Sequence, residues 1–150
     1  MKVFIAADHR GFQLKEQLKE WLAKKGYDVI DSGNTVYEPL DDYPDFASKA
    51  AKGVQKNPEA DRGIVICGSG IGVDIVANKF SGVRCSVGLN ADHVKHGREN
   101  DNINILALPA EHVSLQDAQA MVEVLLQTSF KQEEKYIRRQ KKIEKIENDR

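Results

Sequence analysis

The chain has 150 residues, of which 41% are apolar and 30% are charged, and its formal net charge at pH 7 is −1. This length and composition suit a single domain with an ordinary hydrophobic core. The nearly neutral charge argues against a nucleic-acid or membrane-surface partner. Cys67 and Cys85 are too few for a disulfide framework, and neither a signal peptide nor a long apolar run is found. We therefore expect a cytoplasmic protein.

Short apolar segments alternate with amphipathic ones along the chain. We expect strands at residues 2–7, 27–30, 64–66, 83–87 and 103–108. Helices are expected between Gly11 and Gly26, between Asp42 and Asn57, from Ile71 to Ala77, from Ala91 to Glu99, from Ser114 past Leu125, and from Glu133 to Asn148. Asp42 and Ser114 are the predicted N-caps.

Five strands that alternate with helices predict a parallel α/β sheet covered on both faces. Ligands of such sheets bind at the carboxyl ends of the strands, where the strand order reverses. An order of 2-1-3-4-5 would put the reversal between the first and third strands. Asp8 and His9, which follow the first strand, would then lie beside the segment that follows the third.

Residues 62–78 read as a buried strand, a glycine turn and the start of a helix. Cys67 ends the strand and Ser69 lies in the turn. The N–H groups of such a turn attract an anion, and glycines let a phosphate approach the backbone. The alternative is an ordinary α/β junction with a buried structural cysteine. A P-loop ATPase or GTPase is not indicated, because Gly-Lys-Ser/Thr does not occur.

Several other polar residues have both a binding and a structural interpretation. Asp8 and His9 could contact a sugar or simply cap a helix, and Tyr43 could cover a ligand or staple a helix start. The turn at residues 100–102 is expected at the same end of the sheet as Asp8, His9 and Cys67. No Cys/His pairs have zinc spacing, so no metal and no cofactor are predicted.

Four segments, in order, carry a resemblance to a known family. They are Asp8–Phe12 followed by Leu14-Lys15, Asp42–Pro44, Ile66–Gly72 and Ala77–Lys79. Together they make the chain similar, over nearly its whole length, to type B ribose-5-phosphate isomerase. The wider family includes galactose-6-phosphate isomerase subunits.

The resemblance implies a flavodoxin-like, doubly wound, five-stranded, three-layer αβα domain over residues 1–150 that forms a homodimer or a dimer of dimers. It implies aldose–ketose isomerisation of a sugar phosphate through an enediol, without a metal. Cys67 would be the base. The turn that includes Ser69 would hold the oxyanion, with the backbone at Gly68, Gly70, Ile71 and Gly72.

The resemblance also assigns the substrate contacts. Asp8, His9, Tyr43, Asn100 and Asp101 would contact the sugar. The helix within residues 131–150 would reach the partner subunit, where Lys135 and Arg139 would bind the phosphate. A thiol at a helix N-terminus has a lowered pKa, which suits a base at neutral pH.

The chain departs from the family pattern in three places. Near the C-terminus, Glu133-Glu134-Lys135-Tyr136 replaces a Gly-Gly-Arg-His pattern, while Arg138-Arg139 is kept. Asn100 replaces a histidine that opens the sugar ring, so Asp101, His93 or His96 would have to substitute, or the substrate would enter already open. Glu111 replaces an arginine and is expected to repel a phosphate. Ribose 5-phosphate is the expected substrate. The alternatives are a six-carbon substrate, galactose or allose 6-phosphate, and a non-catalytic phosphosugar-binding module.

Overall fold

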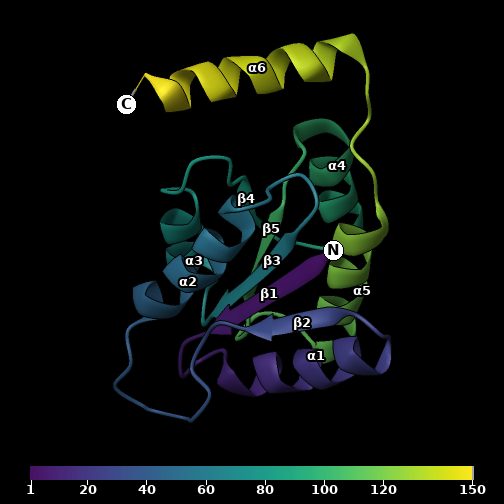
Figure 1. The fold of residues 1–150 in the computed structure, drawn as a ribbon. Helices are drawn as coiled ribbons and strands as arrows, with labels where there is room; N and C mark the ends of the chain where they lie inside the picture. Colours follow the sequence, from purple (N-terminus) through teal and green to yellow (C-terminus); the bar gives the residue numbers. More distant parts are fainter. Residues whose placement is uncertain (150) are drawn as a thin grey trace.

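A computed structural model describes residues 1–149 as strands and helices in regular alternation (Figure 1). The strands are β1 (Lys2–Ala7), β2 (Asp28–Asp31), β3 (Arg62–Cys67), β4 (Cys85–Val87) and β5 (Ile105–Pro109). The helices are α1 (Phe12–Lys24), α2 (Tyr43–Gln55), α3 (Ile71–Ala77), α4 (Ala91–Asp101), α5 (Leu115–Gln127) and α6 (Glu134–Asn148). Every element expected from the sequence forms, with bounds shifted by a few residues.

The five strands form one parallel sheet in the order β2-β1-β3-β5-β4. The expected order 2-1-3-4-5 is therefore wrong at one edge, because β5 lies between β3 and β4. Burial explains the difference. The run Ile105–Leu108 is completely buried, whereas Cys85–Val87 is only half-buried and suits an edge. The reversal of strand order still falls between β1 and β3.

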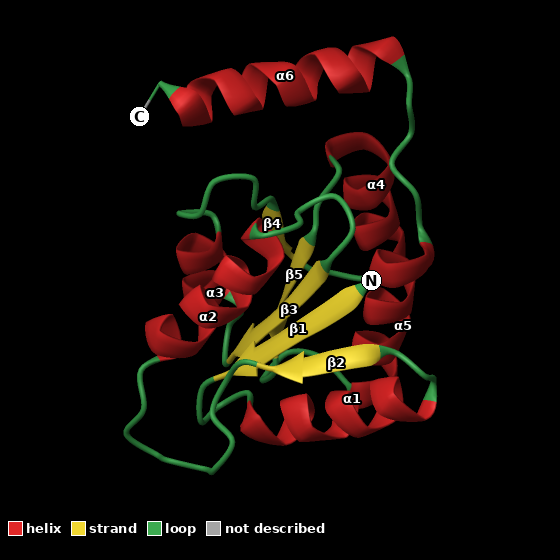
Figure 2. Cartoon of the chain, viewed as in Figure 1, coloured by secondary structure: helices red, strands yellow, loops and turns green. Residues whose placement is uncertain are grey.

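Helices cover both faces of the sheet and give a three-layer α/β fold (Figure 2). Helices α1, α4 and α5 pack on one face, and α2 and α3 pack on the other. Successive strand residues point to opposite faces, so Ile64 and Ile66 join one core while Val65 and Cys67 join the other. The side chain of Cys67 thus belongs to the α2–α3 side.

The helix ends mostly follow the predicted capping chemistry. Gly26, with a φ of 84°, ends α1 in the left-handed region that favours glycine. The side chain of Ser114 accepts the N–H of Asp117 at 3.0 Å and caps α5. Asp42 occupies the N-cap position of α2, but its side chain makes no capping hydrogen bond, so that part of the prediction is wrong.

The last helix, α6, stands apart from the sheet (Figure 1). It contacts α4, and the carboxylate of Glu147 accepts the N–H of Gly82 at 2.9 Å. Ile143 and Ile146 remain 46% and 65% exposed. No helix within residues 1–149 combines the length and the apolar character that crossing a membrane requires.

A buried lysine ties α1 to the end of β2. Lys15 is fully buried, and its ammonium contacts Glu16 and Asp31, each at 2.7 Å. Lys19 shares both carboxylates at 2.8 Å. Burial alone would raise the pKa of Asp31, but its hydrogen bonds to the two lysines outweigh burial and lower that pKa. Asp31 therefore stays ionised and offsets the buried charge.

Replacing Asp31 by Asn should lower the free energy of unfolding by about 3 kcal/mol, because a buried charge loses an opposite partner. Urea unfolding of both proteins measures this. The matched control is Glu20→Gln, which removes an exposed pair with Lys24 (2.6 Å) and should leave Tm nearly unchanged. Equal effects of the two substitutions would contradict the prediction.

The same substitution has a defined pH dependence. The pKa of Asp31 is lower in the folded chain than its ordinary value of 3.8. The stabilisation is therefore complete above that ordinary value and is lost as the pH falls through the lower, folded value. The stability difference between wild type and Asp31→Asn should shrink below that pH range.

Candidate active site

The loop that follows β1 packs directly against the end of β3. The two strands are neighbours in register, with Ala7 opposite Ile66. The N–H of Asp8 donates to the carbonyl of Ile66 at 3.3 Å. A Cβ on Gly11 would lie 2.7 Å from the side chain of Ile66, so only glycine allows this approach. The predicted convergence of the Asp8-His9 loop and the Cys67 turn is thus confirmed.

The turn after β3 wraps its backbone around the sulfur of Cys67. Cys67 is 5% exposed, and the N–H of Gly70 donates to its Sγ at 3.2 Å. Gly70 has a φ of 75°, which an L-residue adopts only with strain. The hydroxyl of Ser69 is exposed and accepts the N–H of Ile71 at 3.3 Å. The turn therefore holds a thiol, a hydroxyl and backbone N–H groups close together.

Tyr43, the first residue of α2, lies beside this turn. Its ring packs so closely on Gly72 that a Cβ there would be 2.6 Å from Cζ. The ring remains 38% exposed. It can therefore cover a molecule bound at the turn while it still contacts the protein.

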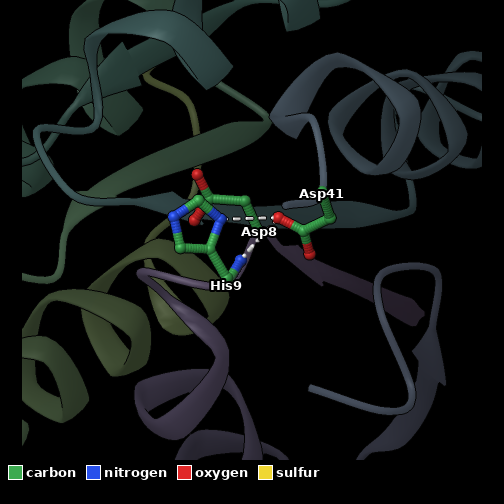
Figure 3. A group of neighbouring side chains, drawn as sticks. All are labelled: Asp8, His9 and Asp41. Atoms are coloured by element: carbon green, nitrogen blue, oxygen red, sulfur yellow. Dashed lines mark hydrogen bonds and ion pairs between the residues drawn. The ribbon is translucent and has the colours of Figure 1, made fainter. Parts of the chain in front are cut away.

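Asp8, His9 and Asp41 form a polar cluster at the same edge of the sheet as the Cys67 turn (Figure 3). The Oδ1 atom of Asp41 accepts the backbone N–H of His9 at 2.9 Å and pairs with its ring Nδ1 at 2.7 Å. Burial alone would raise the pKa of Asp41, but hydrogen bonds from His9 and Asn34 outweigh it and hold that pKa below its ordinary value. Burial raises the pKa of Asp8, against the N–H groups of Gly11 and Arg10 that its carboxylate accepts.

Ligand atoms of these three residues lie within 4.8 Å of one another, which is close enough for a metal ion. However, His9 and Asp41 already bond each other, and Asp8 accepts two backbone N–H groups. Each of the three residues is thus held by hydrogen bonds within the protein.

Arg10 and Glu111 form an ion pair above the Cys67 turn. Arg10 Nε lies 2.6 Å from Glu111 Oε1, and a Cβ on Gly68 would meet both groups at 3.0 Å. The N–H of Glu111 also donates to the carbonyl of Gly68 at 3.1 Å. Arg10 therefore offsets the negative charge of Glu111, which weakens the expected repulsion of a phosphate.

Two sets of predicted site residues lie far from this crevice within the chain. Asn100 and Asp101 form the last turn of α4, just before β5, and so lie at the amino ends of the strands. The expectation that this segment shares the end of the sheet with the crevice is wrong, since residues that precede a parallel strand lie opposite those that follow one.

Lys135 and Arg139 lie on α6, also at the amino end of the sheet (Figure 1). Lys135 pairs with Glu133 at 3.2 Å, and Arg138 pairs with Glu134 at 3.5 Å. Carboxylates at the start of α6 therefore partly neutralise the basic side chains of this helix. Arg139 stacks near the ring of Tyr136.

Sequence patterns did not reveal Asp41 or Arg10 as part of the site. Asp41 bonds a histidine 32 positions away, and Arg10 pairs with a residue beyond β5. The one local signal was the Asp41-Asp42 pair before Tyr43, which could be assigned only to a cap.

Cys85, the second cysteine, is remote from the turn. Burial, together with the charge of Asp74, raises the pKa of Cys85 well above its ordinary value.

The sequence and the fold both match characterised proteins. Residues 3–146 match the model of the Ribose/Galactose Isomerase family, so the chain belongs to that family. Ribose-5-phosphate isomerase B of Mycobacterium tuberculosis is 33% identical over 93% of this chain and 85% of its own.

Solved structures with the same fold include two further ribose-5-phosphate isomerases B. The Clostridium thermocellum protein is 43% identical, with a TM-score of 0.91 over 99% of both chains. The Mycoplasma genitalium protein, solved with bound ribulose-5-phosphate, is 36% identical, with a TM-score of 0.95 over 99% of this chain and 97% of its own.

Replacing Gly70 by Ala should lower the free energy of unfolding by about 2 kcal/mol, since the left-handed backbone costs an L-residue roughly 1–2 kcal/mol. Crowding adds to this cost, because a Cβ there would lie 3.2 Å from the nitrogen of Pro109.

Gly26→Ala is the matched control for the Gly70 substitution. Gly26 has a similar φ of 84° but open space around the missing Cβ, so only the strain remains. Denaturant unfolding compares the two variants. A loss for Gly26→Ala as large as that for Gly70→Ala would show that the turn is not tightly packed.

Proposed function

We propose that the chain interconverts ribose 5-phosphate and ribulose 5-phosphate through an enediol, with Cys67 as the base. The observation that carries this proposal is the convergence of the Cys67 turn, the Asp8-His9 loop and the ring of Tyr43 at one edge of the sheet. Membership of the Ribose/Galactose Isomerase family supports the reaction class. The relatives named for ribose-5-phosphate isomerase B support the choice of substrate.

The chemistry follows from the groups around the sulfur. The thiolate of Cys67 takes a proton from C2 of the open aldose and returns it to C1, which moves the carbonyl. The oxygen that becomes negative in between is stabilised by N–H groups of the turn at Gly68, Ser69 and Gly72, because they are fixed before the charge develops. The N–H groups of Gly70 and Ile71, which were also expected to act, already donate to Cys67 Sγ and Ser69 Oγ. Cys67 has to stay a free thiol, so the reducing cytoplasm is the compartment that we propose.

The phosphate-binding residues and two of the sugar-binding residues are proposed to come from a partner subunit. Asn100, Asp101, Lys135 and Arg139 all lie at the end of the sheet opposite their own crevice. The two elements that carry them contact each other, so they can reach a second crevice together. Exposed apolar side chains at Ile143 and Ile146 give α6 a surface suited to a second copy of the chain.

Cys67→Ala should abolish nearly all isomerisation and leave the fold intact, because alanine keeps the small buried volume but cannot take a proton. Loss of a positioned base lowers the rate by ~10²–10⁴-fold. Cys85→Ala is the matched control and should keep most of the activity, since Cys85 lies on β4 away from the turn. Formation of ketose from ribose 5-phosphate, followed by NMR, measures both. A tenth of the wild-type rate retained by Cys67→Ala would point to another base.

Arg139→Ala should raise KM more than it lowers kcat, because a phosphate contact acts alike in the ground and transition states. Mixing this variant with Cys67→Ala should restore some activity, since one of the two sites in a mixed dimer would contain both native residues. Native mass spectrometry verifies that subunits have exchanged. Exchange without any recovery would rule out a site shared between subunits.

A further inference from the structure

An aldose phosphate reaches the Cys67 base only after its ring has opened. A five-carbon aldose that carries its phosphate on O5 closes through O4 to a hemiacetal. Opening that ring requires a proton to leave the C1 hydroxyl and a proton to reach O4. Asn100 cannot carry a proton between these positions, and its amide contacts His96 at the end of the sheet remote from Cys67. Asn100 of the partner subunit could reach the substrate but could not move the proton either, because an amide does not titrate in a useful pH range. Another group beside the substrate has to carry the proton.

His9 is the residue in the crevice with a ring nitrogen available for this task. Its Nδ1 faces Asp41 at 2.7 Å, and Figure 3 shows the opposite edge of the ring, with Nε2, directed away from Asp41. The side chain of His9 is 29% exposed, so a substrate can reach it. Asp8 is less suited, because its Oδ1 already accepts the N–H groups of Arg10 and Gly11.

Asp41 fixes the orientation and the tautomer of this ring. Its side chain is only 6% exposed, and Oδ1 also accepts the backbone N–H of His9 at 2.9 Å. The second oxygen accepts the side-chain amide of Asn34. A carboxylate held in this way can only accept hydrogen bonds, so in the neutral ring Nδ1 carries the hydrogen and Nε2 keeps its lone pair.

We propose that His9, positioned by Asp41, opens the sugar ring; this inference rests on the proposed isomerase function. Nε2 takes the proton from the C1 hydroxyl, and the C1–O4 bond breaks as the aldehyde forms. The electron pair of that bond stays on O4, which receives the proton back from Nε2. His9 returns to its neutral form, and the carboxylate of Asp41 stabilises the imidazolium between the two transfers. Asp41 thus acts as a positioning residue through His9.

Asp41→Asn provides the test, because ring opening and enediol formation can be measured separately. Ribulose 5-phosphate cannot close a five-membered ring with its phosphorylated O5, so the exchange of its C1 hydrogen with heavy water needs Cys67 but no ring opening. In Asp41→Asn, isomerisation of ribose 5-phosphate should fall roughly 10- to 100-fold, within or just below the ~10²–10⁴-fold range of acid–base groups. Deuterium exchange into ribulose 5-phosphate should stay within about twofold of wild type.

Controls separate this role from general damage. Asp45→Asn makes the same charge change at an exposed position in the first turn of α2 and should leave both rates unchanged. Asp41→Glu should recover part of the ring-dependent rate. If Asp41→Asn does not fold, as judged by circular dichroism, His9→Gln should show the same split between the two measurements.

Each outcome decides between distinct conclusions. An equal loss of both rates, or no loss of either, in a folded Asp41→Asn or His9→Gln variant overturns the role of the pair. An absence of both ketose formation and deuterium exchange in the wild-type protein instead overturns the proposed isomerase function. If the wild type exchanges deuterium, Cys67→Ala loses this exchange and Asp41→Asn keeps it, the result supports both the isomerase function and the role of His9 with Asp41.

Discussion

The close approach of the β1–α1 loop to the end of β3 is the contact on which the site depends. Gly11 lies against Ile66 with no space for a Cβ, and the backbone of Asp8 bonds the same strand. Because strands β1 and β3 are direct neighbours where the strand order reverses, the loop has nowhere else to pack. This contact brings His9 to the edge that carries Cys67, and it makes one crevice from two segments more than fifty positions apart.

Two charged side chains near the carboxyl ends of the strands are held in ion pairs with acidic partners. Lys15 is neutralised by Asp31 inside the protein, and Arg10 is held by Glu111 above the glycine turn. The pairs differ in cost, since the buried ammonium requires its partner while the exposed pair can open toward solvent. The buried pair of Lys15 and Asp31 therefore has a structural role.

The chain carries its proposed site residues at both ends of the sheet. A substrate bound as proposed would contact the turn, Tyr43 and the cluster of Asp8, His9 and Asp41, but α6 lies beyond the opposite ends of the strands. A helix of this length draws its stability mainly from packing, and α6 buries Gln140 alone among its described residues. The proposed assembly with a second copy would cover the exposed face of α6 and would bring its basic residues to the second copy's site.

The sequence by itself determined the alternation of strands and helices, the cap at Ser114, and the placement of Cys67 between a strand and a glycine turn. These features follow from residues near one another in the chain, where periodicity and turn chemistry act. Only the tertiary structure decided that β5 lies between β3 and β4, and that Asn100 lies at the other end of the sheet from Cys67. It also decided that Asp41 and Arg10 join the site. Strand order and long-range pairing depend on which elements exclude most water together, and no local pattern records that competition.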